Sequence, residues 1–297
     1  MKSFPTLKKC LKGKVRFSEP LAKHTTFRIG GPAKIWIEPK GVEDLKKILE
    51  FSKRNRLKYL VIGNGSNILA DDKGFNGVII RLSSPYFREM NVKGTRVIAG
   101  AGAALSNLIR TCCKKSLAGL EGLIGIPGTL GGALCLNAGY KTNIGDFVTK
   151  VRIMDKTGKT KTLKKKDLKF GYRTSNLSRY ILINAELKLK KDDRAYLEKL
   201  CSHLLKLKKN KQPWYGRSAG CVFKNPKKKN ISAGELIDRC GLKGERIGGA
   251  KVSEKHANFI VNINRAKSKD VKLLIDKVKK NVRKKFKVEL EPEIIIL

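Results

Sequence analysis

The feature that most constrains the fold is an uncharged stretch from Gly122 to Gly139. Its length and lack of charge would suit a membrane span on hydropathy alone. It contains six glycines and Pro127, however, and these residues disfavour an uninterrupted helix. We therefore expect a loop whose backbone comes close to a ligand, with these contact residues: Gly125, Ile126, Pro127, Gly128, Thr129, Gly131, Gly132 and Ala133.

A second glycine-rich turn, Gly63-Asn64-Gly65-Ser66-Asn67, follows an expected strand. Its glycines allow consecutive backbone N–H groups to point toward a phosphate. The turn is not a Rossmann fingerprint because Ile68 occupies the position of the third glycine, and the chain has no GxxxxGK[ST] loop. Two such loops can hold a pyrophosphate, although each loop alone is also compatible with a purely structural role.

Strand and helix patterns alternate over the first two-thirds of the chain, which predicts a mixed architecture. The expected strands are Ala33 to Ile37, Tyr59 to Ile62, Gly77 to Leu82, Arg96 to Ala99, Tyr180 to Leu189, Ala257 to Ile263 and Glu293 to Leu297. A hairpin is expected around Asp155 to Gly158, and helices around Leu45 to Leu49, Leu105 to Cys112, Leu197 to Leu205 and Leu236 to Cys240. Ser268 is the expected N-cap of a long final helix, and Gly241 the expected left-handed cap of a short one.

The charge balance is strongly basic, with 66 Lys and Arg against 25 Asp and Glu and a net charge of +41. Such a surface gains affinity for nucleic acid by displacing counterions from phosphates. The basic residues are spread along the whole chain, however, with no aromatic-interleaved patch. We favour a lysine-rich solvated surface over a nucleic-acid face, and a field of this sign also attracts polyphosphate ligands.

Cysteine and histidine usage indicates a reducing compartment and no metal. Seven cysteines without a CxxC pair argue against a disulfide framework, so we expect a cytoplasmic protein. Three histidines without a second ligand at suitable spacing make a zinc site improbable. Pro5 and several lysines interrupt the N-terminal segment, so no export signal is expected.

Eight motifs occur in order across nearly the whole chain. Besides the two glycine-rich segments, they are His24 to Ala33 (HTTFRIGGPA), Gly119 to Gly122 (GLEG), Phe170 to Arg173 (FGYR), Ser218 to Pro226 (SAGCVFKNP), Lys251 to Phe259 (KVSEKHANF) and Leu290 to Glu293 (LEPE). Together they resemble the UDP-N-acetylenolpyruvoylglucosamine reductase family. The short stretch between Arg173 and Cys221 is similar to the type II subgroup, which lacks an inserted substrate-capping loop.

The resemblance implies an α+β protein with a vanillyl-alcohol-oxidase-type (PCMH-like) FAD-binding fold. In such proteins two FAD-binding subdomains are followed by a third α+β domain for the substrate. On this chain we expect the first subdomain at residues 1–75, the second at 76–192 and the substrate-binding domain at 193–289. The C-terminal strand, 290–297, is expected to return to the first subdomain.

The implied activity is that of an FAD-containing oxidoreductase, UDP-N-acetylmuramate dehydrogenase, in peptidoglycan precursor synthesis. NADPH would reduce FAD, which would then reduce the double bond of UDP-N-acetylglucosamine enolpyruvate. Three catalytic residues carry over from the family motifs. Arg173 would bind the substrate carboxylate and stabilise the enolate, and Glu293 would assist. The third position departs from the family, because Cys221 stands where a proton-donating serine is usual.

A thiol remains a reasonable proton donor at this position, since its ordinary pKa of about 8.5 makes it a stronger acid than a hydroxyl. The alternative is an inert cysteine with water as the proton donor. The family motifs also imply substrate contacts from five further residues: Tyr172, Lys224, Asn225, His256 and Asn258. The protein is expected to be a monomer with no nucleic-acid or membrane partner.

Two other functions are compatible with parts of the sequence. Another flavoenzyme of the same fold would account for the glycine loops but not for SAGCVFKNP or the Arg173 and Glu293 pair. A basic nucleic-acid-binding protein without catalysis would account for the charge alone. A flavin spectrum in the purified protein would exclude the second, and NADPH oxidation dependent on the enolpyruvyl substrate would exclude the first.

Overall fold

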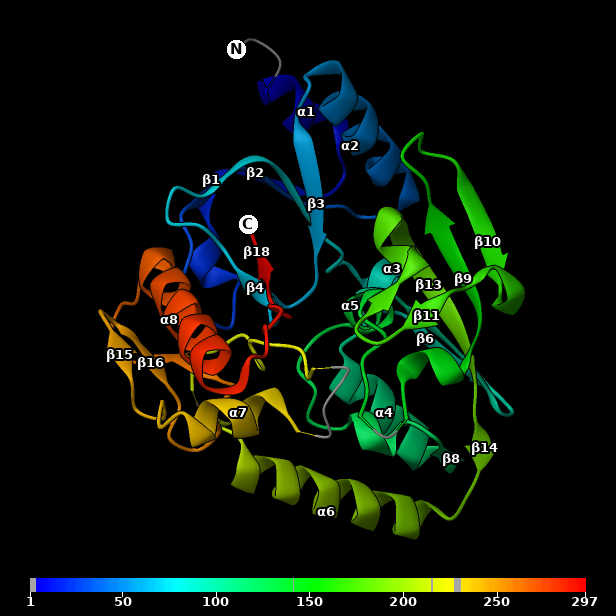
Figure 1. The fold of residues 1–297 in the computed structure, drawn as a ribbon. Coiled ribbons are helices and arrows are strands. Elements are labelled where there is room, and N and C mark those ends of the chain that lie inside the picture. The colour runs from blue at the N-terminus through cyan, green and yellow to red at the C-terminus, as the bar shows by residue number, and fades with distance from the viewer. Residues whose placement is uncertain (1–3, 141, 215, 227–230) are drawn as a thin grey trace. The chain divides into compact units, whose positions relative to one another are not determined.

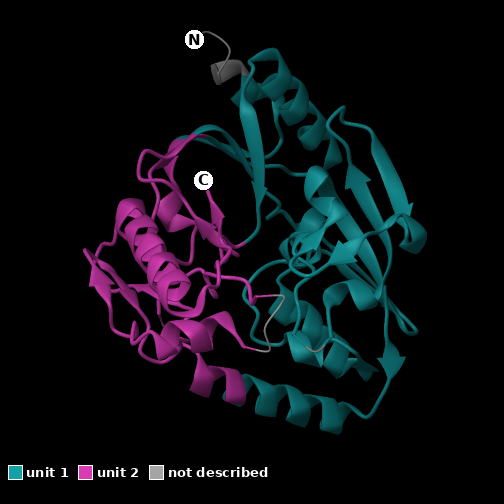
Figure 2. Cartoon of the chain, in the orientation of Figure 1, with its two compact units in different colours: residues 1–17, 35–63, 76–206 teal, residues 18–34, 64–75, 207–297 magenta. Residues whose placement is uncertain are grey.

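The computed structural model describes residues 4–140, 142–214, 216–226 and 231–297. The chain forms two compact units, drawn in teal and magenta in Figure 2. Unit 1 comprises residues 1–17, 35–63 and 76–206, and unit 2 comprises residues 18–34, 64–75 and 207–297. The chain therefore passes between the units several times, and the division into domains at 75, 192 and 289 stays a prediction.

Unit 1 contains most of a four-stranded sheet with the strand order β1-β2-β5-β3. Its strands are β1 (Lys14–Pro20), β2 (Pro32–Glu38), β5 (Phe75–Arg81) and β3 (Lys58–Ile62), and β3 runs parallel to β5. The helices α1 (Phe4–Cys10) and α2 (Val42–Arg54) belong to the same part of the chain. Leu45, Ile48 and Leu49 of α2 are buried in the core of unit 1, as helical spacing predicts.

The second sheet of unit 1 has five antiparallel strands in the order β10-β9-β13-β7-β6 (Figure 1). Their bounds are β6 (Met90–Lys93), β7 (Arg96–Gly100), β9 (Val148–Met154), β10 (Thr160–Lys164) and β13 (Ile181–Lys188). The predicted hairpin joins β9 to β10, and the Asp155 carboxylate accepts the backbone N–H groups of Thr157 and Lys159. A short carboxylate side chain is suited to such a turn because it can accept hydrogen bonds from the following backbone.

The remaining elements of unit 1 are short and connect these sheets. They are α3 (Pro85–Arg88), α4 (Leu105–Lys114), α5 (Leu130–Cys135), β8 (Leu117–Ala118), β11 (Phe170–Gly171), β12 (Thr174–Ser175), β14 (Lys190–Lys191) and the 3-10 helices η2 (Glu121–Leu123), η3 (Ile144–Asp146), η4 (Lys165–Asp167) and η5 (Asn176–Arg179). The uncharged segment thus folds into η2, a loop and α5. Within the described part of the chain, no helix has the length and apolarity to cross a membrane.

Unit 2 combines a small sheet with two helices. The sheet has the order β15 (Arg246–Ile247), β16 (Ala250–Val252) and β17 (Ile260–Asn262), and α7 (Ala233–Arg239) and α8 (Ser268–Phe286) share its core. The 3-10 helix η1 (Leu21–Lys23) and the parallel pair β4 (Ile68–Leu69) and β18 (Ile295–Ile296) complete the unit. Helix α6 (Arg194–Lys211) begins in unit 1 and ends in unit 2.

Most predicted elements are present, and their ends differ for local reasons. Gly241 has a φ of 71° and follows α7, which confirms the predicted left-handed cap. The strand predicted at Ala257 to Ile263 is shorter, because the backbone up to Phe259 is folded into a turn in which Phe259 N donates to His256 O. The last strand contains only Ile295 and Ile296 rather than the whole of 293–297.

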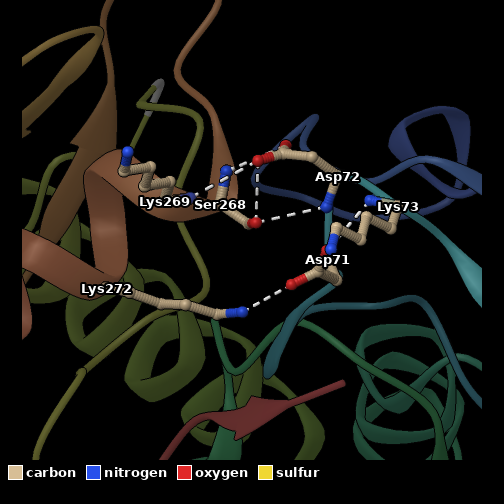
Figure 3. Close-up of polar contacts among 6 residues, drawn as sticks. All are labelled: Asp71, Asp72, Lys73, Ser268, Lys269 and Lys272. Atoms are coloured by element: carbon tan, nitrogen blue, oxygen red, sulfur yellow. Dashed lines mark hydrogen bonds and ion pairs between the residues drawn. The ribbon is translucent and has the colours of Figure 1, made fainter.

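The prediction that Ser268 caps α8 was wrong, because Lys267 is the N-cap and Ser268 is the first helical residue. A carboxylate from the loop after β4 binds the start of the helix instead (Figure 3). Asp72 accepts hydrogen bonds from Ser268 N at 2.9 Å and from Ser268 Oγ at 2.8 Å, and Lys272 pairs with Asp71. An anion is favourable at this end of a helix because the first backbone N–H groups have no partner within the helix.

Candidate active site

The first residue of one glycine-rich segment, Gly63, lies against the other segment within unit 1. Gly63 follows the last residue of β3, and a Cβ at this position would lie 2.6 Å from Thr129 Oγ1. No ordinary side chain tolerates such a distance, so only glycine allows the strand end and the loop to approach this closely. The end of β3 and the loop that leads into α5 are therefore neighbours in unit 1.

Hydrogen bonds of its backbone hold the loop at Gly125 to Ala133 in place. Gly128 has a φ of 144°, and its carbonyl accepts a hydrogen bond from Leu105 N at the start of α4. Leu130 N donates to Ala103 O at 2.9 Å. These hydrogen bonds therefore attach the loop to the segment before α4 and to the first residue of α4.

Two amides that the sequence suggested for ligand binding donate within the protein. Gly131 N donates to Ala101 O at 2.8 Å, and Gly132 N donates to Thr129 Oγ1 at 3.3 Å, where Thr129 is the N-cap of α5. A Cβ on Gly131 would lie 3.0 Å from Ala101 O. The structure therefore gives the glycine at 131 a packing role, and the predicted cofactor contacts of Gly131 and Gly132 remain predictions.

Arg173 lies in the turn of a tight hairpin between β11 and β12, also in unit 1. Its φ of 55° is unusual for a residue with a side chain, and such conformations persist only where surrounding contacts fix them. The guanidinium donates from Nη1 to Gly139 O at 2.8 Å and lies 5.5 Å from the centre of the Tyr172 ring. Tyr172 itself is exposed.

Two buried polar side chains attach this hairpin to the region of α5. Asn137 donates from Nδ2 to Gly171 O at 3.1 Å and accepts from Gly145 N at 3.1 Å. Ser175 Oγ bonds the carbonyls of Leu134 and Cys135, the last turn of α5. The hairpin with Arg173 and the glycine loop that leads into α5 are thus parts of one framework.

Sequence reasoning did not assign Asn137 to the site. A signal was present, because Asn137 is the only amide side chain in the uncharged stretch from Gly122 to Gly139. A polar residue in such a stretch is usually retained to satisfy buried backbone groups.

In unit 2, Cys221 and Glu293 belong to neighbouring backbone segments. Glu293 N donates to Val222 O at 2.7 Å, and Phe223 forms a bridge with Pro292. On its other side, Cys221 forms an antiparallel bridge with Phe259. Two of the three predicted catalytic residues are therefore brought together by main-chain pairing within one unit.

Asn258 holds the Cys221 segment through both ends of its side-chain amide. Its Oδ1 accepts from Phe223 N at 2.9 Å and its Nδ2 donates to Phe223 O at 2.8 Å, while Val222 N donates to Asn258 O. The residue is 3% exposed. This arrangement gives Asn258 a positioning role for the segment with Cys221, and its predicted contact with substrate stays a prediction.

His256 is a partly buried neighbour of this segment. Its Nδ1 accepts a hydrogen bond from Asn258 N at 3.2 Å, and its ring lies edge-on to that of Phe259. Burial lowers the pKa of His256, and the nearby positive charge of Lys243 lowers it further. The imidazole is therefore neutral at neutral pH, with its proton on Nε2.

The turn from Asn64 to Asn67 is built into unit 2 by contacts with the HTTFRIGG motif. Gly65 has a φ of 63°, and a Cβ there would lie 2.2 Å from His24 O. Thr26 Oγ1 donates to Ser218 O at 2.6 Å and also contacts Gly65 O. Asn67 Nδ2 donates to Glu293 O at 3.0 Å, so this turn also fixes the backbone that carries Glu293.

The other predicted substrate residues of unit 2 are at its surface. Lys224 pairs with Glu291 at 3.2 Å, and Asn225 accepts from Ala233 N at the start of α7. These contacts orient both side chains but do not test their predicted binding of substrate. Among the described residues, no group of three or more His, Cys, Asp or Glu side chains is suited to hold a metal ion.

The chain is similar to known proteins over nearly its whole length. Residues 33–164 match the FAD-binding domain family, and residues 212–297 match the C-terminal domain of UDP-N-acetylenolpyruvoylglucosamine reductase. The UDP-N-acetylenolpyruvoylglucosamine reductase of Caldanaerobacter subterraneus subsp. tengcongensis is 41% identical, covering 98% of this chain and 96% of that protein. The Bacillus subtilis protein of the same name is 39% identical, covering 96% and 94%.

Solved structures agree with this assignment. The crystal structure of UDP-N-acetylenolpyruvylglucosamine reductase from Thermus caldophilus has a TM-score of 0.82 and 34% identity, covering 96% of this chain and 99% of that one. A BBE-like protein of Physcomitrella patens, with a TM-score of 0.50 and 18% identity over 62% of this chain and 44% of that one, shares the fold alone.

These matches confirm the predicted α+β, vanillyl-alcohol-oxidase-type fold and the predicted cofactor. The two glycine-rich segments meet where Gly63 touches Thr129, and their backbone suits FAD because glycine-rich backbone can present N–H groups to a pyrophosphate. The chain belongs to the FAD-dependent UDP-N-acetylenolpyruvoylglucosamine reductase family.

Proposed function

We propose that this protein reduces UDP-N-acetylglucosamine enolpyruvate to UDP-N-acetylmuramate with electrons from NADPH, in the synthesis of peptidoglycan precursors. The support is family membership over 98% of the chain together with the framework that each unit provides. Unit 1 carries Gly63, the loop at Gly125 to Ala133 and Arg173, and unit 2 carries the turn from Asn64 to Asn67, Cys221 and Glu293. FAD, when bound, supplies the hydride chemistry.

Arg173 has the role of binding the substrate carboxylate and stabilising the negative charge that develops beside it. A guanidinium suits this role because it stays protonated and presents parallel N–H groups to two oxygens. Its hairpin is fixed by Asn137 and Ser175, so the charge is held in place before the substrate arrives. A charge that is already oriented stabilises a transition state without the cost of reorganisation.

Cys221 has the role of proton donor to the enolate carbon, and Glu293 assists in stabilising the enolate. The observation that supports this pairing most directly is the hydrogen bond from Glu293 N to Val222 O. It keeps the two residues on adjacent backbone segments. A thiol can lose a proton to a carbon base more readily than the serine hydroxyl usual in the family.

Replacing the thiol tests this role. Cys221→Ala should leave reduction of the flavin by NADPH intact, while reduction of the enolpyruvyl substrate slows by roughly 10² to 10⁴, the usual contribution of a general acid. Anaerobic stopped-flow measurements separate the two half-reactions. Cys221→Ser should retain substrate reduction, and Cys240→Ala serves as a matched cysteine control in the same unit.

Unchanged substrate reduction in Cys221→Ala would reject the proton-donor role while leaving the overall reaction in place. The overall function has its own test, which is NADPH oxidation by the wild-type protein. If that oxidation does not depend on UDP-N-acetylglucosamine enolpyruvate, the proposed reaction is wrong.

We also propose that the enzyme acts in the cytoplasm as a monomer, without a nucleic-acid or membrane partner. All seven cysteines are free thiols, as suits a reducing compartment. Light scattering coupled to size exclusion should give the mass of one chain, 33.1 kDa plus FAD. Retention by heparin that persists at high salt would contradict the expected absence of a specific nucleic-acid site.

A further inference from the structure

Two cysteines in unit 1, remote in sequence from the proposed active site, lie within contact of each other. Cys113 is near the end of α4 and Cys201 is in the middle of α6, and their sulfur atoms are 3.4 Å apart. Neither residue belongs to the glycine segments or to the Arg173 hairpin. The proposed reductase reaction therefore gives this pair no role.

The pair lies beside a cavity that a small molecule can enter. The cavity has a volume of about 350 Å³, and both sulfur-bearing residues line it. The other lining residues are Arg110, Lys114, Ile124, Glu198, Ser202 and Leu205. Cys201 is partly exposed, whereas Cys113 is buried. A small oxidant in the cavity would therefore meet a pair of thiols rather than a single one.

We propose that Cys113 and Cys201 are a reversible oxidation site, at which a hydroperoxide converts the two thiols into a disulfide that joins α4 to α6. A disulfide needs a sulfur–sulfur distance of about 2.05 Å, so the two atoms must approach by a little over 1 Å. Rotation of the two cysteine side chains, which both line the cavity, can bring the sulfur atoms this much closer.

The reaction balances with the peroxide as the only oxidant. One cysteine, as thiolate, attacks an oxygen of the hydroperoxide, breaks the O–O bond and becomes a sulfenic acid. The second sulfur then attacks the sulfenic sulfur, the S–S bond forms, and the hydroxyl leaves as water. With hydrogen peroxide, two thiols and one peroxide give one disulfide and two waters. A thiol reductant restores the pair.

The surroundings of the pair set the rate of this reaction. Burial raises the pKa of Cys113, and burial together with the neighbouring Cys113 raises the pKa of Cys201 to about 12. Both groups are therefore thiols at neutral pH, and only the small thiolate fraction reacts. The site stays reduced under ordinary conditions and responds to sustained peroxide, with a rate that rises about tenfold per pH unit below the thiol pKa.

The bond would connect two helices with separate roles in the chain. The first residue of α4, Leu105, donates its N–H to the carbonyl of Gly128, in the loop at Gly125 to Ala133. Helix α6 begins in unit 1 and ends in unit 2. The disulfide would close a loop whose ends are 88 positions apart in sequence. Closing a long loop restricts the unfolded chain, so oxidation should stabilise the protein.

The test oxidises the FAD-loaded full-length protein with hydrogen peroxide and counts free thiols after denaturation. We expect the count to fall by two from seven and to recover with dithiothreitol. Peptide mapping without reductant should recover the fragment of Cys113 joined to that of Cys201. The Tm of the oxidised protein should rise by on the order of 5 °C.

Cys201→Ala should abolish both the joined peptide and the rise in Tm, and the variant should stay folded because Cys201 is partly exposed. Cys112→Ala, at the neighbouring buried position of α4, should leave both effects intact. A joined peptide that contains other cysteines, or wild-type protein that keeps Cys113 and Cys201 reduced throughout peroxide treatment, would overturn the proposal. Neither result depends on the reductase reaction, so the two proposals fail separately.

Discussion

The two units build their parts of the site in different ways. In unit 1, a glycine allows a neighbouring segment to approach too closely for a Cβ, as at Gly63 beside Thr129 Oγ1 and Gly131 beside Ala101 O. Unit 2 has such approaches too, as at Gly65 beside His24 O, but there side-chain amides and hydroxyls also connect segments that are remote in sequence. Asn67 reaches Glu293 and Thr26 reaches Ser218, across 226 and 192 positions respectively.

The difference predicts opposite sensitivities. Added atoms should damage unit 1, because the space they need is already occupied by backbone or by a short side chain. Removed polar atoms should damage unit 2, because each leaves a buried backbone group without its partner. Removing a polar group in unit 1, as well as adding atoms there, shows whether the two units really differ in these sensitivities.

The largest loss of stability is expected for Asn258→Ala in unit 2. The change removes both hydrogen bonds to Phe223 and leaves a buried N–H and a buried carbonyl without them. At 1–3 kcal/mol for each such group, the free energy of unfolding should fall by about 4 kcal/mol. Urea unfolding of the FAD-loaded protein measures it, with Asn264→Ala on the surface of unit 2 as the control. A loss below about 1 kcal/mol would contradict the positioning role of Asn258.

Asn137→Ala tests whether unit 1 is also sensitive to the loss of a polar side chain, since Asn137 lies in unit 1 but acts through its side-chain amide. It should cost about 3 kcal/mol, from two lost hydrogen bonds and from a φ of 45° that asparagine tolerates better than alanine. Because the Arg173 hairpin loosens, kcat for substrate reduction should also fall, while flavin reduction by NADPH does not. Asn91→Ala, exposed on β6, is the control. Equal losses in both half-reactions would argue against a specific effect on Arg173.

Gly63→Ala tests the excluded space of unit 1 directly. The new methyl group would meet Thr129 Oγ1 at 2.6 Å, and overpacking of this kind costs about 2 kcal/mol. If this loss of about 2 kcal/mol affects only the FAD-bound protein, the affinity for FAD should fall roughly 30-fold. Equilibrium dialysis with FAD measures the change, and Gly41→Ala, where a Cβ meets nothing within 4 Å, should bind FAD normally. Partial recovery in Gly63→Ala/Thr129→Ala would identify the contact responsible.

The smallest effect concerns pH and unit 2. Burial lowers the pKa of His256 below its ordinary value of 6.5, so below that value the unfolded chain binds a proton that the folded chain resists. The stabilisation that neutral His256 contributes is therefore fully present above about pH 6.5. It is lost as the pH falls toward the pKa of His256 in the folded protein. His256→Gln should flatten the dependence of unfolding free energy on pH below about pH 6.5.

Elements with strong local patterns were predictable from the sequence. The apolar spacing of α2 and α4, the β9–β10 hairpin around Asp155 and the cap at Gly241 depend on neighbouring residues alone. The start of α8 was not predictable, because its capping carboxylate, Asp72, is 196 positions away. The role of Asn258 was missed for the same reason, since a motif gives the residue but not the backbone group that it binds.

The sequence by itself determined the family and the FAD cofactor, because ordered motifs and glycine positions are properties of the chain. The roles of Arg173, Cys221 and Glu293 stay predictions from the same motifs. Only the tertiary structure decided that Gly63 lies against Thr129, that Glu293 is hydrogen-bonded to the segment of Cys221, and that Cys113 meets Cys201. Hydrogen bonds and steric contacts act over a few ångströms, whatever the number of residues between the partners. Chain order therefore reveals which groups are present, and folding alone selects the pairs that touch.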